Sequence, residues 1–410
     1  MANTLATPTW VTKEIAYKFL NDIKFVSNIS RSYDDQYVQA GAKVGDTVKA
    51  RIPQRFTATD GQALQVQNLY DQTVDISLTN QKNVAFSYSS AQATTQLDNI
   101  RERYVDPAAA TLANAADVLA YNQIYRDIYN AIGTPGTTPS TTLQYLQAGV
   151  KLTDMAVDTD GRVAVLDPMA MATIANTSSS LFNPAAVISE NYKNGMFGRN
   201  QLGTAAWYQD PNAARHTTGT FTASTPLVNG ASQTGSSLIT DGWASGATSL
   251  KKGDIFTIAG VNSVNPVSYV DTGRLQQFVV TADISDTTGA ITMAISPSII
   301  TSGNLQTVTA SPADNAAITV WSANPAGGTL ATTVSPQSIL FTKDFAAFVM
   351  ADLKKPSAGA IATSVRSKEF GISIRMVEQY QINNDQNPSR LDILIGAATI
   401  NGGRAVRVVG

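Results

Sequence analysis

Alternating apolar and polar residues predict a long β-hairpin in the first quarter of the chain. The stretch 48–52 places Val, Ala and Ile at every second position, as in a half-buried strand, and Pro53 then interrupts regular pairing. A second alternating region covers residues 74–88, and the polar stretch 57–70 between the two contains the turn signal Asp60-Gly61. Two strands alone are only marginally stable in water, so we expect the hairpin to pack against its own domain or against another chain.

Helical spacing of apolar residues predicts a helix at the start of the chain. Thr7 is a suitable cap, Pro8 fits the first turn, and apolar residues then recur every three or four positions as far as Val26. A terminal amphipathic helix of this kind can belong to the core of its own subunit. It can equally be an arm that packs on a neighbouring subunit.

A longer helix is predicted over residues 107–132. Asp106 is a good cap, Pro107 fits the first turn, and Gly133 marks the end. Some 26 residues would give a rod roughly 39 Å long. Its many alanines would let neighbouring elements approach closely. The predicted apolar stripe comprises Leu112, Ala116, Leu119, Ile124 and Ile128.

Alternation of helix, turn and strand follows and indicates an α+β organisation. A helix predicted over 143–157 is followed by the turn 158–161 and by the apolar run 162–166, which is typical of a buried strand. The end of the chain predicts three more strands, at residues 370–379, 390–396 and 405–409.

Between His216 and Pro336 the composition changes to Thr, Ser, Gly and Val, with no helical period. The clearest predicted strands are 255–259, 277–282 and 290–295. Short strands at this spacing favour a small sandwich or barrel. Because the flanking segments are α+β, the β-rich stretch is interpreted as an inserted domain.

Charge is sparse along the whole chain. Charged residues make up 15%, against roughly 25% in typical soluble domains. A surface of small polar residues suits extensive protein–protein contact, and it is also found in β-rich extracellular proteins. The net charge is −2, and the most evident basic pairs, Lys251-Lys252 and Lys354-Lys355, stand apart in the sequence. Any contact with DNA is therefore expected to be weak.

Few residues offer catalytic or metal-binding chemistry. Cysteine is absent, and His216 is the only histidine, at a domain boundary and without a nucleophile motif. The sequence Asp158-Thr-Asp160-Gly161 begins like a calcium loop, but Met169 stands where the loop needs its final Glu. No phosphate-binding glycine loop, signal peptide or membrane-spanning run is evident. Paired acids for glycoside hydrolysis remain open, although their spacing does not favour them.

The order of these elements resembles the tailed-bacteriophage capsid fold, which is also seen in encapsulin shells. The inserted β segment resembles that of short-tailed-phage coat proteins with an additional β-barrel domain. The stretches that carry the resemblance are Gly45–Pro53, Arg162–Pro168, Gly195–Gly198 with Ala205–Asp210, Leu250–Val261, and Gly371–Arg375 with Leu391–Gly396.

The resemblance implies an α+β tailed-phage major capsid fold with an all-β insertion domain. It places an N-terminal arm at residues 1–43 and an E-loop hairpin at 44–90. The peripheral domain, with its spine helix, and the axial domain would share 91–216 and 337–410. The insertion domain would occupy 217–336.

The function implied by the resemblance is that of a non-enzymatic major capsid protein without cofactor or metal. It would form an icosahedral shell of hexamers and pentamers around dsDNA, with a scaffolding protein and a portal protein as partners and only weak, non-specific contact with the DNA. It would be assembled in the host cytoplasm and found in the virion. The alternatives are an encapsulin-like compartment, another phage structural protein, or a secreted β-rich enzyme or adhesin.

Two departures from the family pattern bear on subunit contacts. The expected counterpart of a charged insertion-domain loop, 227–241, carries only Asp241, and no Lys has the context of an isopeptide crosslink, so a non-covalent shell is expected. The candidates for subunit interfaces lie in the arm, in the hairpin and in the charged segment before the long helix. They are Trp10, Phe19, Arg51, Arg55, Asp60, Leu69, Arg101, Glu102 and Arg103.

Overall fold

The computed structural model describes most of the chain between residues 23 and 409. The described ranges are 23–31, 47–58, 61–62, 64–69, 72–89, 106–178, 202–221, 225–246, 248–285, 288–322, 332–356, 359–367 and 372–409. The predicted helix from Thr7 therefore lies almost wholly outside the described residues, as does Gly195–Gly198. The chain divides into two compact units: unit 1 holds 1–50, 73–121 and 346–398, and unit 2 holds 51–72, 122–345 and 399–410.

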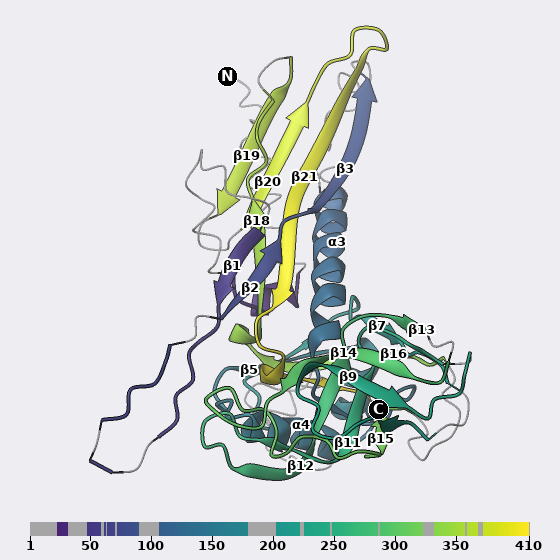
Figure 1. The fold of residues 1–410 in the computed structure, drawn as a ribbon. Helices are drawn as coiled ribbons and strands as arrows, with labels where there is room; N and C mark the ends of the chain where they lie inside the picture. Colours follow the sequence, from purple (N-terminus) through teal and green to yellow (C-terminus); the bar gives the residue numbers. More distant parts are fainter. Residues whose placement is uncertain are drawn as a thin grey trace. The chain divides into compact units, whose positions relative to one another are not determined.

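Unit 1 contains two sheets (Figure 1). Strands β1 (Thr47–Arg51) and β2 (Thr73–Ser77) pair with each other, as the alternating pattern predicts. A five-stranded sheet has the order β18-β21-β20-β19, with β3 on β21. Its strands are β3 (Asn80–Ser89), β18 (Ala346–Ala351), β19 (Ile361–Ser367), β20 (Ile372–Glu378) and β21 (Gln386–Thr399). The two strands predicted at 370–379 and 390–396 are thus present in this sheet.

The segment 23–31 packs inside unit 1. Phe25 lies 4.3 Å from the ring of Tyr121, and the amide of Val26 donates to Asp117 Oδ1 at 3.0 Å. A bridge between Ser30 and Ala347 ties the segment to β18. This part of the predicted arm therefore belongs to the core of its own subunit.

The long helix α3 spans Asp106–Ile124, so the prediction of a helix as far as Ile132 is wrong beyond residue 124. The chain tightens into the 3-10 turn η5 (Tyr125–Asp127), becomes extended at Ile128, and forms β4 (Ala131–Ile132). No Gly or Pro marks this change. β4 pairs in parallel with the C-terminal strand β22 (Ala405–Val408), and these long-range bonds replace helical ones.

The predicted stripe of α3 is buried at Leu112, Ala116 and Ile124, whereas Leu119 is only half-buried. At 1.5 Å per residue, α3 is roughly 28 Å long. The alanines at positions 109, 113 and 120 are also buried. Their small side chains allow the close approach that the sequence predicts.

Unit 2 contains a mixed five-stranded sheet with the order β4-β22-β17-β5-β6. Its remaining strands are β5 (Arg162–Leu166), β6 (Ala206–Gln209) and β17 (Ser338–Thr342). The helices α4 (Thr142–Asp154) and α5 (Pro168–Ser178) share a hydrophobic core with this sheet. The mixed sheet with its helices is called the α/β core below.

The second part of unit 2 is a closed β-barrel. Six strands have the order β15-β11-β12-β14-β9-β8, and Leu227 of β8 bridges Ala317 next to β15, which closes the sheet. The strands are β8 (Leu227–Val228), β9 (Gly235–Asp241), β11 (Ile255–Val264), β12 (Asp271–Val280), β14 (Ile291–Ile299) and β15 (Ile318–Val320). The barrel has its own core, which includes Leu238, Phe256, Phe278 and Met293. The expected loop 227–241 is instead two barrel strands and the turn between them.

Two short strand pairs accompany the barrel, and one of them joins its two ends. Strand β7 (Arg215–Thr217) pairs with β16 (Val334–Pro336), so the two ends of the β-rich stretch lie side by side. Strand β10 (Ser249–Leu250) pairs with β13 (Ile284–Ser285). None of the helices in the described part of the chain is long and apolar enough to cross a membrane.

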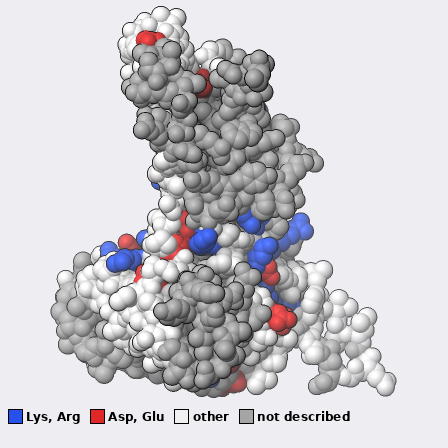
Figure 2. Space-filling model, turned by 180° about the vertical axis from the view of Figure 1, so that it is seen from behind, with Lys and Arg blue, Asp and Glu red and all other residues white. Residues whose placement is uncertain are grey.

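The charged residues are few on the described surface. Among the described residues that are visible in Figure 2, most are uncharged, and several Lys and Arg lie next to Asp and Glu. This agrees with the charged fraction of 15%.

Arg162 at the start of β5 closes the C-terminal end of α4. Its Nε and Nη1 donate to the carbonyls of Asp158 and Gly149, at 2.8 and 3.0 Å, and its Nη2 donates to Val157 O at 2.6 Å. The side chain is buried, so its loss would leave the carbonyls of Val157 and Asp158 without these donors. We expect Arg162→Met, which keeps the length and removes the donors, to lower the free energy of unfolding by about 2–5 kcal/mol. Chemical denaturation of the unassembled subunit measures this loss, and an unchanged midpoint would contradict it.

Candidate functional site

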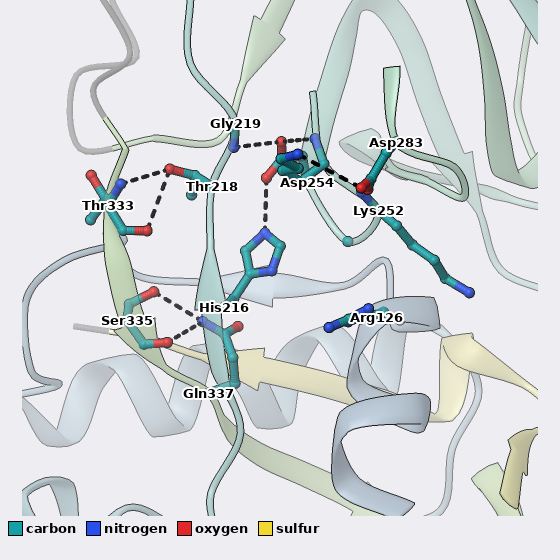
Figure 3. Close-up of polar contacts among 12 residues, drawn as sticks. Arg126, His216, Thr218, Gly219, Lys252, Asp254, Asp283, Thr333, Ser335 and Gln337 are labelled. Atoms are coloured by element: carbon teal, nitrogen blue, oxygen red, sulfur yellow. Dashed lines mark hydrogen bonds and ion pairs between the residues drawn. The ribbon is translucent and has the colours of Figure 1, made fainter. Parts of the chain in front are cut away.

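The most elaborate polar site in the described part of the chain joins the β-barrel to the α/β core. It lies where β7 and β16 run side by side, and Figure 3 shows its residues. Thr218 reinforces the strand pair, because its hydroxyl accepts from the amide of Thr333 at 3.0 Å. This site is called the junction below.

The carboxylate of Asp254 is the centre of the junction. Its Oδ1 lies 2.8 Å from His216 Nε2, and its Oδ2 accepts from the amides of Gly219 at 3.0 Å and Lys251 at 2.8 Å (Figure 3). Asp254 is only 5% exposed. A buried carboxylate is costly unless it is hydrogen-bonded, and here three donors from two separate segments satisfy it. The turn before β11 is therefore fixed to β7.

His216 links Asp254 to the turn that follows α3. Its Nδ1 lies 3.3 Å from the hydroxyl of Tyr125, which also accepts from Arg126 Nε at 3.3 Å. A neutral imidazole that donates from Nε2 and accepts at Nδ1 satisfies both contacts. Burial is the largest cause that lowers the pKa of His216 below its ordinary value, and the hydrogen bond to Asp254 opposes it. The neutral form is the one that fits this site.

Arg407 of β22 brings the C-terminal strand into the junction. The side chain is fully buried, and its Nη2 donates to the carbonyl of Gly253 at 2.7 Å. Its guanidinium carbon lies 5.8 Å from the ring centre of Trp321, within cation–π range. Burial lowers the pKa of Arg407 to about 10, so the group remains charged at neutral pH, close to Asp254. Its Nε and Nη1 have no hydrogen-bond partner among the described residues.

A second set of contacts lies beside β4. Gln277 of β12 accepts from the amide of Ala131 at 3.0 Å and donates to its carbonyl at 2.9 Å. Trp321 Nε1 donates to Gly133 O at 2.9 Å. Ala131 also packs against Ile255 and Val279 in a small apolar cluster. The amide of Gln277 therefore acts like an additional strand partner for β4.

Ion pairs complete the contact between the barrel and the α/β core. Arg274 pairs with Asp154 at 2.7 Å at the end of α4, and Asn265 donates to the carbonyl of Asp154 at 3.0 Å. Lys252 lies 3.2 Å from Asp127 of η5. These pairs are partly exposed and contribute little stability individually. They fix the orientation of the barrel.

The hydrogen bonds that join Tyr125, His216 and Asp254 in series resemble those of a catalytic relay. The burial of these residues is unlike that of a catalytic group, which must meet a substrate. The three residues are 2%, 5% and 5% exposed, respectively, so solvent does not reach the imidazole. A general base must come within hydrogen-bond reach of a substrate proton, and this histidine is enclosed. The arrangement suits a fixed structural joint.

The sequence-based interface candidates lie elsewhere. Arg51 ends β1 with an exposed side chain, Arg55 is half-buried, and Leu69 is 73% exposed. The base of the hairpin tip contacts the barrel loops. Asn304 donates to the carbonyl of Arg55 at 3.3 Å, and the hydroxyl of Tyr269 donates to the carbonyl of Phe56 at 3.4 Å. The candidates that lie outside the described residues are Trp10, Phe19, Asp60, Arg101, Glu102 and Arg103.

Only indirect signals in the sequence point to the junction. Asp254 falls within the stretch 250–261, the most specific part of the family resemblance, and His216 stands at the composition change. Arg407 had no such signal, since its partner Gly253 is 154 positions away.

Comparison with known protein families shows which family the chain belongs to. The family model of the P22 coat protein, gene protein 5, matches residues 1–406. The chain belongs to the P22 coat protein family. It is a tailed-phage major capsid protein that forms the icosahedral shell. The capsid-like fold with mixed sheets and few helices agrees with this assignment.

Solved structures give weaker similarities. The chain is similar to Mycobacterium phage Che8 at 12% identity, covering 93% of this chain and 88% of that one, with a TM-score of 0.45. It is similar to the capsid of Ralstonia phage GP4 at 10% identity, with coverage of 94% and 89% and a TM-score of 0.41. The CUS-3 coat protein I-domain matches 24% of this coat protein and 96% of its own chain at 30% identity, with a TM-score of 0.19. A search of curated proteins gave no match.

The junction predicts a pH dependence of the coat protein's stability. The pKa of His216 is lower in the folded than in the unfolded chain, so the unfolded chain takes up the proton first as the pH falls. The contribution of the neutral imidazole is therefore complete above about pH 6.5 and decreases below it. We expect the stability difference between wild type and His216→Gln to shrink between about pH 7.5 and about pH 5. Urea unfolding of both subunits across this range measures it, and a constant difference would contradict it.

Gly219 predicts a steric limit at the same site. A Cβ at this position would lie 2.0 Å from Ser249 O and 2.9 Å from Asp254 Oδ2. We expect Gly219→Ala to cost about 3 kcal/mol, because the backbone of β10 must shift. The matched control is Gly149→Ala, whose Cβ would meet only Arg162 Nη1, at 3.7 Å, and which favours helix by up to about 1 kcal/mol. Equal melting temperatures for the two variants would refute the steric argument.

Proposed function

We propose that the chain is a non-enzymatic shell subunit that assembles as hexamers and pentamers around a scaffolding protein. The observation that carries this proposal is the family match over residues 1–406. The enclosed setting of His216 supports a structural role, because the one imidazole of the chain is committed to a buried joint. The shell is assembled in the host cytoplasm, receives dsDNA through a portal protein, and becomes part of the virion.

The domain organisation that we propose has an arm at 1–43, an E-loop hairpin at 44–90, and peripheral and axial domains formed by 91–216 and 337–410. The insertion domain is 217–336. Two observations support these last bounds: the barrel has its own hydrophobic core, and β7 pairs with β16 at its two ends. An insertion whose ends meet can be accommodated without disturbing the surrounding sheet.

The low charge of the chain indicates how it interacts with the packaged DNA and with neighbouring subunits. The chain has a net charge of −2, and sequence-independent DNA binding requires rows of Lys and Arg. We expect contact with the packaged DNA to be weak. We also expect subunits to hold together without covalent links.

Expression of the coat protein with its scaffolding protein tests the proposal. Closed particles should sediment far ahead of the free subunit, and electron microscopy should show both hexamers and pentamers. A fully soluble monomer with hydrolase activity would falsify the proposed function. Hollow particles that form without any scaffolding protein and package no DNA would favour an encapsulin-like compartment.

The tip of the hairpin predicts a role in assembly. Leu64 and Val66 are 91% and 83% exposed, so they contribute almost nothing to the stability of their own subunit. Deletion of residues 60–69 should leave a folded monomer that fails to form stable shells. The milder variant Leu64→Thr/Val66→Thr should melt like wild type and assemble more slowly.

The control for this prediction is Ile239→Thr/Val334→Thr, which changes two other exposed apolar side chains, 48% and 54% exposed. Sedimentation of the particles and thermal melts of the monomers measure both effects. Normal shells from the deletion variant would remove the hairpin tip from the assembly mechanism.

A further inference from the structure

The five-stranded sheet of unit 1 carries a pocket lined by four basic residues and one acidic residue. Its volume is about 480 Å³. Strands β20 and β21 provide its floor, and the loop after β18 provides one wall. The residues that line it are Lys354, Lys355, Pro356, Arg375, Val377, Gln379, Pro388, Arg390 and Asp392.

The strand register explains why these residues meet. Arg375 lies opposite Asp392, and Val377 lies opposite Arg390. Side chains at every second position share one face of a strand, so both arginines point to the same side of the sheet. Lys354 and Lys355 approach that face from the loop, and the carbonyl of Lys354 accepts from Arg375 Nη1.

The charge of the pocket is unbalanced. Asp392 is buried and pairs with Arg375 Nη2 and with Arg390 Nε, each at 2.6 Å. One carboxylate thus lies among four cations. The ammonium groups of Lys354 and Lys355 have no ion pair within the described ranges, and Arg375 Nε has no hydrogen-bond partner there. The pocket thus carries an excess of positive charge, although the chain as a whole has a net charge of −2.

The shape of the pocket selects the kind of anion. Guanidinium groups form strong hydrogen bonds to carboxylates, and Asp392 at the floor accepts one from each of the two arginines. Binding to duplex DNA requires cations in a row along the phosphates, whereas these four surround a single pocket. Val377 and the two prolines add apolar walls that suit the aliphatic part of a side chain.

We propose that this pocket receives an acidic side chain of a second copy of the chain. The proposal rests on the proposed function, since a shell holds other copies next to every subunit at fixed positions. Each copy carries 31 acidic residues, so the partner surface offers the complementary charge. Charge complementarity of this kind fixes register and speeds encounter between subunits.

Zero-length carbodiimide crosslinking tests the proposal, because it joins a lysine amine to a carboxylate only in direct contact. Shells are assembled from an equal mixture of 15N-labelled and unlabelled subunits, crosslinked and analysed by mass spectrometry. We expect Lys354 or Lys355 to be joined to an Asp or Glu peptide of the coat protein, with mixed isotope labels. Crosslinks with a single label, crosslinks to scaffolding protein, or none at these lysines would each overturn the proposal.

Assembly of Lys354→Ala/Lys355→Ala provides the second measurement. Both lysines are exposed, so the monomer should melt like wild type. We expect the subunit concentration needed for assembly to rise at least tenfold at low salt, and much less at high salt, where screening weakens the wild-type contact. The matched control is Lys82→Ala/Lys343→Ala, which removes two other exposed lysines.

The two measurements separate this inference from the proposed function. If the double variant assembles like the control while particles form normally, the pocket is not a subunit contact, and the shell function is unaffected. If wild-type subunits form no particles under any condition, the proposed function itself fails.

Discussion

The need to satisfy one buried carboxylate, that of Asp254, shapes the connection between the barrel and the α/β core. An ionised carboxylate away from water needs several donors. Two of its donors are backbone amides, from Gly219 and Lys251, and the third is the only imidazole of the chain. Because Gly219 follows β7 and Lys251 lies in the turn before β11, the carboxylate can be satisfied only when both segments are in place. The barrel therefore joins the core in one arrangement.

The remaining contacts of the junction depend on this arrangement. Gly253, next to Asp254, presents its carbonyl to the buried Arg407, so the C-terminal strand β22 is held by the turn before β11. Gln277 then binds β4 through both the oxygen and the nitrogen of its side-chain amide. Breaking one partner of such a buried network costs more than the pair contributes, since the other is left charged and unpaired.

Local pattern predicted much of the fold. The alternation at residues 48–52 predicted β1, the apolar run 162–166 predicted β5, and the change of composition near His216 marked the start of the barrel segment. The end of α3 could not be predicted in this way. Residues 125–132 have helical spacing, but Ala131 forms hydrogen bonds with Gln277, 146 positions away. Arg407 lies in an apolar strand pattern, and only the folded chain brings it to Gly253. Interactions over such separations leave no local signal, and the subunit contacts of a shell leave none within one chain.

Hydrogen exchange at the junction is the most direct test of this account. The amides of Gly219 and Lys251 donate to Asp254, so they should exchange only when the segment that follows β7 separates from the turn before β11. Their protection should then equal that of Phe256 and Phe278, which lie in central barrel strands. Exchange by mass spectrometry on the unassembled subunit measures both sets of peptides. Equal protection supports a rigid joint centred on Asp254, whereas fast exchange of the peptides around Gly219 and Lys251, with the strands still protected, would contradict it.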